Sequence, residues 1–188
     1  MTILQHLQLN ERKISGTGDL TATLDNAAAV DQGNGIVRIP ATAHAFAVGS
    51  HIYIEGTTNY NGLFELQAVA ANTFDIAAPF VAETFAGTET AAFVLTATRK
   101  WMMVGFGINI TVAPSSAQNI VFTVDNADGA SFDFILTDLT QDLDTVTGFS
   151  SMLAEEKRIP LNAGDIIRVT WANTQGRTYG LKAYFQEI

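Results

Sequence analysis

Residues Gly35–Glu83 read GIVRIPATAHAFAVGSHIYIEGTTNYNGLFELQAVAANTFDIAAPFVAE, a series of short apolar runs that begin or end at turn residues. Four of these runs have the length and composition of β-strands: 36–39, 51–54, 63–66 and 73–76. Asn61-Gly62 lies between two of them, and this dipeptide typically forms a hairpin turn with positive φ at both residues. Closely spaced short strands with tight turns predict a small β-barrel, SH3-like or similar, over residues 35–95.

The segment before this stretch, residues 1–34, lacks comparable runs. Ser15-Gly16-Thr17-Gly18 interrupts any regular element, and residues 31–35 are rich in turn-forming residues. A segment with so few apolar residues does not form a core by itself. We therefore expect an irregular N-terminal arm over residues 1–34, either a disordered tail or a segment that becomes ordered on a neighbouring molecule.

The apolar runs become longer after residue 96. Residues 101–110 alternate between apolar and other residues with one slip near Gly105, where we expect a β-bulge. Further alternating runs follow at 120–124, 132–136, 158–161, 166–171 and 179–185. Regularly spaced strands of this kind predict a β-sandwich, jelly-roll-like, over residues 96–188. The only helical expectation is a single turn within residues 150–157.

Composition and charge exclude several classes of protein. Charged residues make up 15% of the chain, against about a quarter in an average domain. Such a surface suits a protein that buries area against copies of itself or a partner, and also a neutral β-protein rich in Ala, Thr and Asn. The formal net charge of −9 disfavours nucleic-acid binding through a basic patch. The absence of cysteine excludes disulfides and thiolate chemistry.

The chain also lacks the segments that direct a protein into or across a membrane. No apolar run reaches the length of a transmembrane helix. Residues 1–6 have neither the basic start nor the apolar region of a secretory signal. We therefore expect a protein made in a cytosol, with no membrane partner.

The histidines and acidic residues offer candidate metal or catalytic sites. His6, His44 and His51 have no carboxylate spaced to complete a metal triad, and we interpret His44 as a loop residue and His51 as a strand residue. The Asp-rich loop 125–144 could supply oxygens to calcium, but the EF-hand spacing fails at Ala127. We prefer β-turns for this loop, with a calcium site between Asp138 and Asp144 as the open alternative.

Other enzyme motifs are incomplete. Asp138, Asp142 and Glu155 could be combined into a glycosidase pair, although any acidic β-protein offers such combinations. The chain has no G-x-S-x-G elbow, and Gly105-Phe106-Gly107 lacks the third glycine of a dinucleotide loop. We therefore assign no catalytic, cofactor-binding or metal-binding residue, and we expect no enzymatic activity and no cofactor.

Aromatic residues and one arginine of the C-terminal half have two possible roles. Trp101, Trp171, Tyr179 and Phe185 could stack on sugar rings, but at alternating strand positions such residues are more often core or interface. We favour the core for Trp101 and leave Trp171 open. Arg177 could pair with an Asp inside the sandwich or with a neighbouring subunit.

Three phrases of the first module carry a resemblance to a known class of proteins. They are Phe46-Ala47-Val48-Gly49-Ser50, Ile54-Glu55-Gly56-Thr57-Thr58-Asn59-Tyr60-Asn61-Gly62 and Ala71-Asn72-Thr73-Phe74-Asp75-Ile76. Together they resemble a module of tailed-bacteriophage structural proteins. The C-terminal phrases Leu161–Val169 and Asn173–Gly180 are similar to β-sandwich domains of small phage virion proteins.

This resemblance implies a capsid decoration (cement) or head-fibre protein located in the virion and assembled in the host cytoplasm. Its expected partner is the major capsid protein or another virion protein, and a homo-oligomer, with a trimer favoured, is the implied assembly. The alternative is a tail or fibre component that binds host-surface glycans. The resemblance transfers no catalytic residue.

Overall fold

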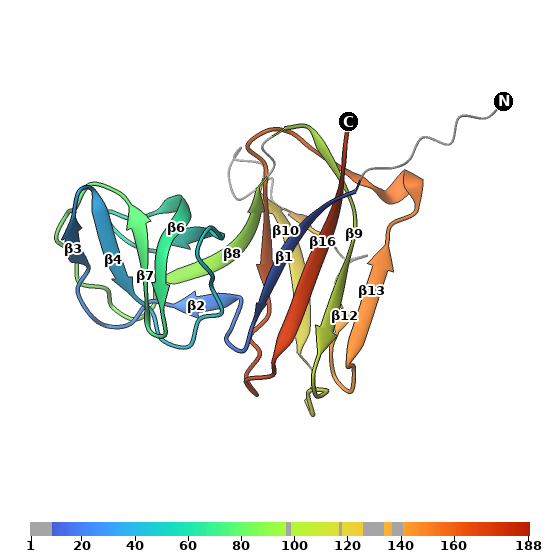
Figure 1. The fold of residues 1–188 in the computed structure, drawn as a ribbon, viewed down its shortest axis with the longest axis horizontal. Helices are drawn as coiled ribbons and strands as arrows, with labels where there is room; N and C mark the ends of the chain where they lie inside the picture. Colours follow the sequence, from blue (N-terminus) through green and yellow to red (C-terminus); the bar gives the residue numbers. More distant parts are fainter. Residues whose placement is uncertain (1–8, 97–98, 117, 126–133, 137–140) are drawn as a thin grey trace.

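The computed structural model describes residues 9–96, 99–116, 118–125, 134–136 and 141–188, and it confirms the predicted all-β class. Figure 1 shows two lobes joined by strands that run between them. The strands are β1 (Leu9–Gly16), β2 (Thr21–Thr23), β3 (Val30–Gly33), β4 (Ile36–Pro40), β5 (His51–Glu55), β6 (Gly62–Ala70), β7 (Thr73–Ala77), β8 (Thr90–Thr96), β9 (Trp101–Ile110), β10 (Asn119–Asp125), β11 (Phe134–Ile135), β12 (Gln141–Asp142), β13 (Gly148–Met152), β14 (Ile159–Leu161), β15 (Ile166–Thr170) and β16 (Tyr179–Glu187).

Two antiparallel sheets face each other in the C-terminal lobe, which we call the sandwich. The first sheet has the order β1-β16-β9-β13, and β14 also pairs with β9. The facing layer consists of β10, β15 and the end of β8, with β11 and β12 paired to β10. Phe106 of β9 and Phe122 of β10 meet between the layers, with ring centroids 4.5 Å apart. The predicted sandwich is therefore confirmed.

Strand β8 belongs to both lobes. Its first residues pair with β2 on one edge and with β5 on the other, whereas Val94–Thr96 pair with β15 of the sandwich. The five residues from Ala91 to Leu95 are all buried, so both faces of the strand are covered. The N-terminal lobe, formed by β2–β7 and the start of β8, is called the first module below. One continuous sheet thus connects the first module to the sandwich.

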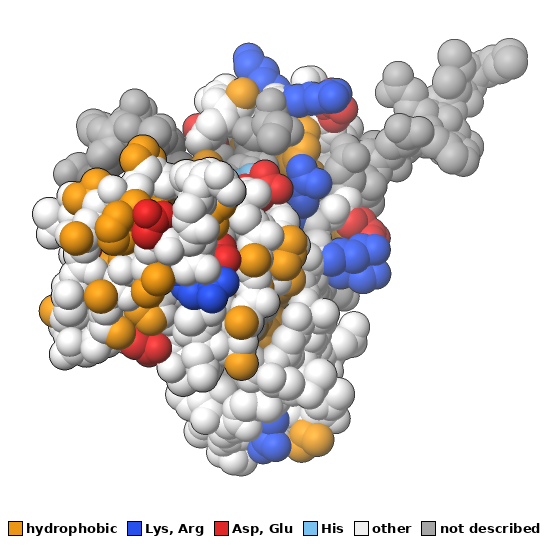
Figure 2. All heavy atoms as spheres, turned by 60° about the vertical axis from the view of Figure 1, so that its left-hand side comes forward, with side chains coloured by type: hydrophobic (Ala, Val, Ile, Leu, Met, Phe, Trp, Pro, Cys, Tyr) orange, Lys and Arg blue, Asp and Glu red, His pale blue; other side chains and the backbone are white. Residues whose placement is uncertain are grey.

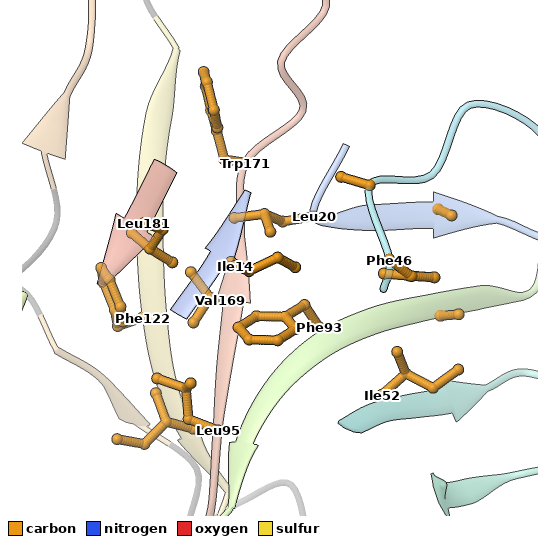
Figure 3. Close-up of a cluster of buried hydrophobic side chains, with 14 of the residues drawn as sticks. Ile14, Leu20, Phe46, Ile52, Phe93, Leu95, Phe122, Val169, Trp171 and Leu181 are labelled. Carbon is orange, nitrogen blue, oxygen red and sulfur yellow. The ribbon is translucent and has the colours of Figure 1, made fainter. Parts of the chain in front are cut away.

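The hydrophobic core is also continuous across this junction. Figure 3 shows Phe93 of β8 pointing toward Val169 and Ile14 of the sandwich, with Phe46 and Ile52 of the first module on the other side. All five side chains belong to a single cluster of buried residues. The two lobes therefore share apolar contacts as well as backbone hydrogen bonds.

The N-terminal segment differs from the expectation of an irregular arm. All eight residues of β1 pair with β16, from Leu9 opposite Gln186 to Gly16 opposite Tyr179, and Ile14 is buried in the sandwich. Strands β2 and β3 pair with β8 and β4. The partner of β1 lies at the opposite end of the chain, so local composition around residues 9–16 did not reveal the strand.

The first module contains the predicted strands, but they do not close into a barrel. In the described residues, the strand order runs β8-β5-β6-β7-β4-β3 and ends at an unpaired edge of β3. The expected two-residue turn at Asn61-Gly62 is also wrong. Residues 56–61 form a longer connection, and of this pair only Gly62 has a positive φ.

Two smaller predictions are confirmed. The pairing of β9 with β16 shifts register where Tyr184 lies opposite Gly105 and Phe185 lies opposite Met103, so the bulge is at the predicted place. Gly105 has a φ of 156°, and a Cβ there would come within 2.2 Å of the Ser151 carbonyl oxygen. The single helical turn within 150–157 is the 3-10 turn Glu155–Lys157.

Candidate functional site

A network of side chains fixes the connection between β5 and β6 to the loop before β8. Asn61 Oδ1 accepts hydrogen bonds from the Thr57 N–H at 2.9 Å and from Thr57 Oγ1 at 3.0 Å, and Tyr60 N–H donates to Thr57 Oγ1. The buried Tyr60 hydroxyl then donates to the Val81 carbonyl at 2.6 Å and accepts from the Val81 N–H at 2.9 Å. This tyrosine therefore holds Val81 by both of its backbone polar groups.

Glu83 also connects the β5–β6 connection to the loop before β8. Its carboxylate accepts the backbone N–H groups of Thr58 at 2.6 Å and Asn59 at 2.8 Å. The Glu83 carbonyl accepts the Ala29 N–H at 2.9 Å, which places the start of β3 beside this loop. Hydrogen bonds to a charged carboxylate are among the stronger ones in proteins. The loop is thus held from both sides.

Three exposed apolar residues belong to the segments that this network joins. Val30 is 49% exposed, Phe80 42% and Val81 46%. We call these three residues the candidate docking surface. The run Ala77–Ala82, which contains two of them, carries no charged residue. In Figure 2, where the first module is turned forward, hydrophobic side chains are exposed across this lobe with few charges between them. Exposed apolar residues on a segment that is held in place are candidates for contact with a partner.

Arg168 fixes the position of the first module relative to the sandwich. It lies on β15 and donates to Glu55 of β5 at 2.8 Å and to Asp125 of β10 at 3.0 Å. Its guanidinium also lies 4.3 Å from the ring centroid of Tyr53, on β5. The arginine side chain is only 20% exposed. One cation therefore joins three strands drawn from both lobes.

Of the three histidines, the structure describes two, and it does not bring them together as a site. His44 stacks on Phe46 at 5.0 Å and its Nδ1 accepts the Phe46 N–H at 3.3 Å. Burial lowers the pKa of His44, opposed by the backbone carbonyls of Thr73 and Ala70. His51 lies on β5, as predicted. His6 is outside the described residues.

Two of the acidic residues considered for metal binding or catalysis make structural contacts. Asp142 Oδ1 accepts the backbone N–H groups of Gln118 and Asp144, which fixes a turn, and Asp125 pairs with Arg168. Glu155 lies in the 3-10 turn. Of the Asp-rich loop 125–144, residues 126–133 and 137–140, which include Asp138, lie outside the described residues. Among the described residues, no group of three His, Cys, Asp or Glu side chains could hold a metal ion.

The aromatic residues proposed for sugar stacking are buried. Trp101 is 5% exposed, which confirms its core role, and Trp171 is 1% and Tyr179 3% exposed. Trp171 and Tyr179 pack edge to face at 4.9 Å. Burial raises the pKa of Tyr179, with a contribution from Asp19. Arg177 donates to Gln175 Oε1 within its own turn rather than to an Asp.

Sequence reasoning missed the candidate docking surface. The signal was the run Ala77–Ala82, which is apolar but follows no strand alternation and directly precedes Glu83. Contacts of Tyr60 and Glu83, and the bond from the Ala78 N–H to the Gly35 carbonyl, hold this run in place.

Comparisons with known proteins add no assignment. No family model, no curated protein and no solved structure matches the chain. Within the described residues, no helix is both long enough and apolar enough to cross a membrane.

Proposed function

We propose that this chain is a non-enzymatic virion protein, a decoration protein that binds the outer surface of a tailed-phage head and stabilises it by bridging capsomers. The observation that carries the proposal is the shared strand β8, which makes two lobes into one body with the candidate docking surface at its far end. The resemblance of residues 46–76 to phage modules suggests the particle. The major capsid protein is the proposed partner.

The physical argument concerns rigidity. A part that bridges two capsomers resists their separation only if force passes through it without bending. Covered backbone edges along β8, the shared core and Arg168 supply that stiffness. The polar side chains described above are used to hold turns and strands, which suits a structural part. A homo-oligomer, with a trimer favoured, would multiply the number of attachments per copy.

The network around Tyr60 gives the resemblance a physical meaning. Thr57, Tyr60 and Asn61 belong to the phrase that resembles phage modules, and their contacts hold Val81 in its exposed position. The residues of this sequence motif therefore hold the backbone of Val81 in place, next to Phe80 in the chain. Rigid presentation lowers the entropy lost on binding.

The test uses heads of the phage that encodes this chain, purified after deletion of its gene. Wild-type protein should co-sediment with these heads in hundreds of copies and delay heat-induced release of DNA. The double variant Phe80→Asp, Val81→Asp should bind at least about tenfold more weakly, because both side chains would lose their apolar contacts. Val112→Asp is the matched control, since Val112 is 54% exposed and lies beyond the end of β9 in the sandwich.

The outcomes separate the proposal from its alternative. Equal binding by the double variant would exclude Phe80 and Val81 as the docking surface. Failure of the wild type to bind heads, together with a handful of copies per intact virion, would replace the decoration role with the tail or fibre role. Light scattering of the purified chain measures the oligomeric state in the same preparation.

A further inference from the structure

The outer face of the first sheet contains an open cavity of about 640 Å³, on the side away from the sandwich core. Its floor is formed by β1, β16, β9 and β13, and Ala47 of the first module lines it as well. The cavity is separate from the candidate docking surface, which lies at the end of the first module. The inference drawn from it is independent of the capsid proposal.

The cavity exists because the outward positions of neighbouring strands are occupied by glycines. In one row across the sheet, Gly180 of β16 lies beside Asn109 of β9, which lies beside Gly148 of β13. In the next row, Gly107 lies between Lys182 and Ser150. A Cβ added at Gly180 would meet nothing within 4 Å. The sheet is therefore hollow where most sheets carry a layer of side chains.

Positively charged groups gather at one side of this hollow. Lys13 and Lys182 lie directly opposite each other on β1 and β16, with side chains 58% and 48% exposed. Like charges in directly opposed positions destabilise a sheet. Both ammonium groups lie near a single carboxylate, that of Glu11. The two lysines and this glutamate together therefore carry a net charge of +1. This excess is unusual in a chain with a formal net charge of −9.

The remaining wall groups are hydroxyls, an amide and one aromatic ring. Tyr184 lies over the glycine floor, because its hydroxyl is 3.7 Å from where a Cβ of Gly107 would be. Asn109, Ser15 and Ser150 also line the cavity. Hydroxyl and amide groups can both donate and accept, which matches the hydroxyls of a sugar, and an aromatic ring offers a face for a pyranose.

The floor of the cavity offers side chains rather than free backbone groups to a ligand. Strands β16 and β9 are paired on both edges over these rows, so their N–H groups are not free to bind a phosphate. An extended peptide that adds to a sheet pairs along an open edge, and the central floor strands β16 and β9 have none. We propose that the cavity between Lys13, Lys182, Tyr184 and Asn109 binds an acidic saccharide, one bearing a uronic or sialic carboxylate. The carboxylate pairs with the lysines, and the sugar ring lies on the glycine floor against Tyr184.

The test measures binding of defined saccharides to the full chain by titration calorimetry. The probes are oligogalacturonate against neutral galactose oligomers, and sialyllactose against lactose. At least one acidic probe should bind about tenfold or more tightly than its neutral partner, because a charge-assisted contact is lost in the neutral sugar. The double variant Lys13→Gln, Lys182→Gln should remove this preference, whereas Lys100→Gln, at the other end of β9, should leave it unchanged.

A variant that fills the cavity but keeps both lysines distinguishes a role of the lysines in binding from a role in stability. Gly180→Val adds its Cβ where the structure has no atom within 4 Å, so it fills part of the floor, and it leaves both charges in place. It should abolish saccharide binding while the unfolding midpoint stays the same or rises. Three results would overturn the proposal: no acidic probe binds at millimolar concentration, Gly180→Val binds as the wild type does, or a poly-glutamate peptide binds more tightly and competes for the site.

Discussion

The first module and the sandwich are both antiparallel β-structures, but they are held together differently. In the first module, strands that follow each other along the chain pair directly, as β3 does with β4, β5 with β6 and β6 with β7. The sandwich depends on aromatic packing and on pairing between distant strands, as in β1 with β16. Local contacts form at small entropic cost, whereas distant pairs require a long loop to close. The difference explains which half of the molecule is easy to recognise in the sequence.

The largest expected effect comes from removing the side chain that both regions share. Phe93→Ala should lower the free energy of unfolding by about 4 kcal/mol, because it leaves a cavity at the junction. Denaturation in urea, followed by tryptophan fluorescence and by circular dichroism, measures the loss. Both probes should shift together. If only the fluorescence transition moves, then the first module folds independently of the sandwich, since both tryptophans lie in the sandwich.

The second substitution, at Gly18, tests the close backbone contact between the segment that follows β1 and the segment around Ala43 and His44. A Cβ at Gly18 would lie 2.3 Å from the Ala43 carbonyl oxygen and 2.5 Å from the His44 carbonyl carbon. Gly18→Ala should therefore cost about 3 kcal/mol through forced separation of the two segments. Gly180→Ala is the matched control, since its Cβ meets no atom. Equal stability of the two variants in urea would show that this contact is not tightly packed.

Replacing Arg168 removes polar contacts at the junction between the first module and the sandwich. Arg168→Met retains much of the aliphatic length but removes the bonds to Glu55 and Asp125, and we expect a loss of about 2 kcal/mol. Arg99→Met removes the exposed pair with Glu187 and should not change stability measurably. Thermal unfolding of both variants measures this difference. Equal effects would mean that Arg168 contributes no more than a surface ion pair.

The smallest expected loss of stability comes from removing the charge of Glu89, in the first module. The Ala86 N–H, followed by other backbone groups of the loop 86–89, holds the pKa of Glu89 below its usual value of 4.5. A carboxyl whose pKa is lowered by folding adds stability above its unfolded pKa, and this contribution disappears as the pH falls through the folded value. Glu89→Gln should be less stable than the wild type at pH 7, by less than Arg168→Met. The difference in stability between this variant and the wild type should narrow below about pH 4.5. A difference that is constant with pH would contradict this role.

The strands that could be predicted from sequence are those whose signals are local. The runs at 51–54, 73–76 and 166–171 coincide with β5, β7 and β15 to within a residue, because turn residues lie next to each one. The bulge at Gly105 was visible as a slip in alternation. Strand β1 was missed because its alternation is interrupted by Glu11, Arg12 and Lys13 at an exposed sheet edge.

The candidate sites were less predictable than the fold. The candidate docking surface depends on hydrogen bonds from Tyr60 to a residue twenty-one positions away, and no local pattern encodes such a contact. The cavity on the outer face of the first sheet depends on Gly107, Gly148 and Gly180 lying in adjacent rows, which requires the strand register. The residues chosen from sequence for sugar stacking, Trp171 and Tyr179, are instead buried, because they lie on inward positions.

The account rests on the claim that β8 joins the first module and the sandwich into one cooperative unit. Differential scanning calorimetry of the full chain tests this claim most directly. We predict a single transition whose calorimetric and van't Hoff enthalpies agree, since neither lobe retains a covered β8 without the other. Two separate transitions, or a calorimetric enthalpy well above the van't Hoff value, would contradict it and would remove the rigid body on which the bridging role depends.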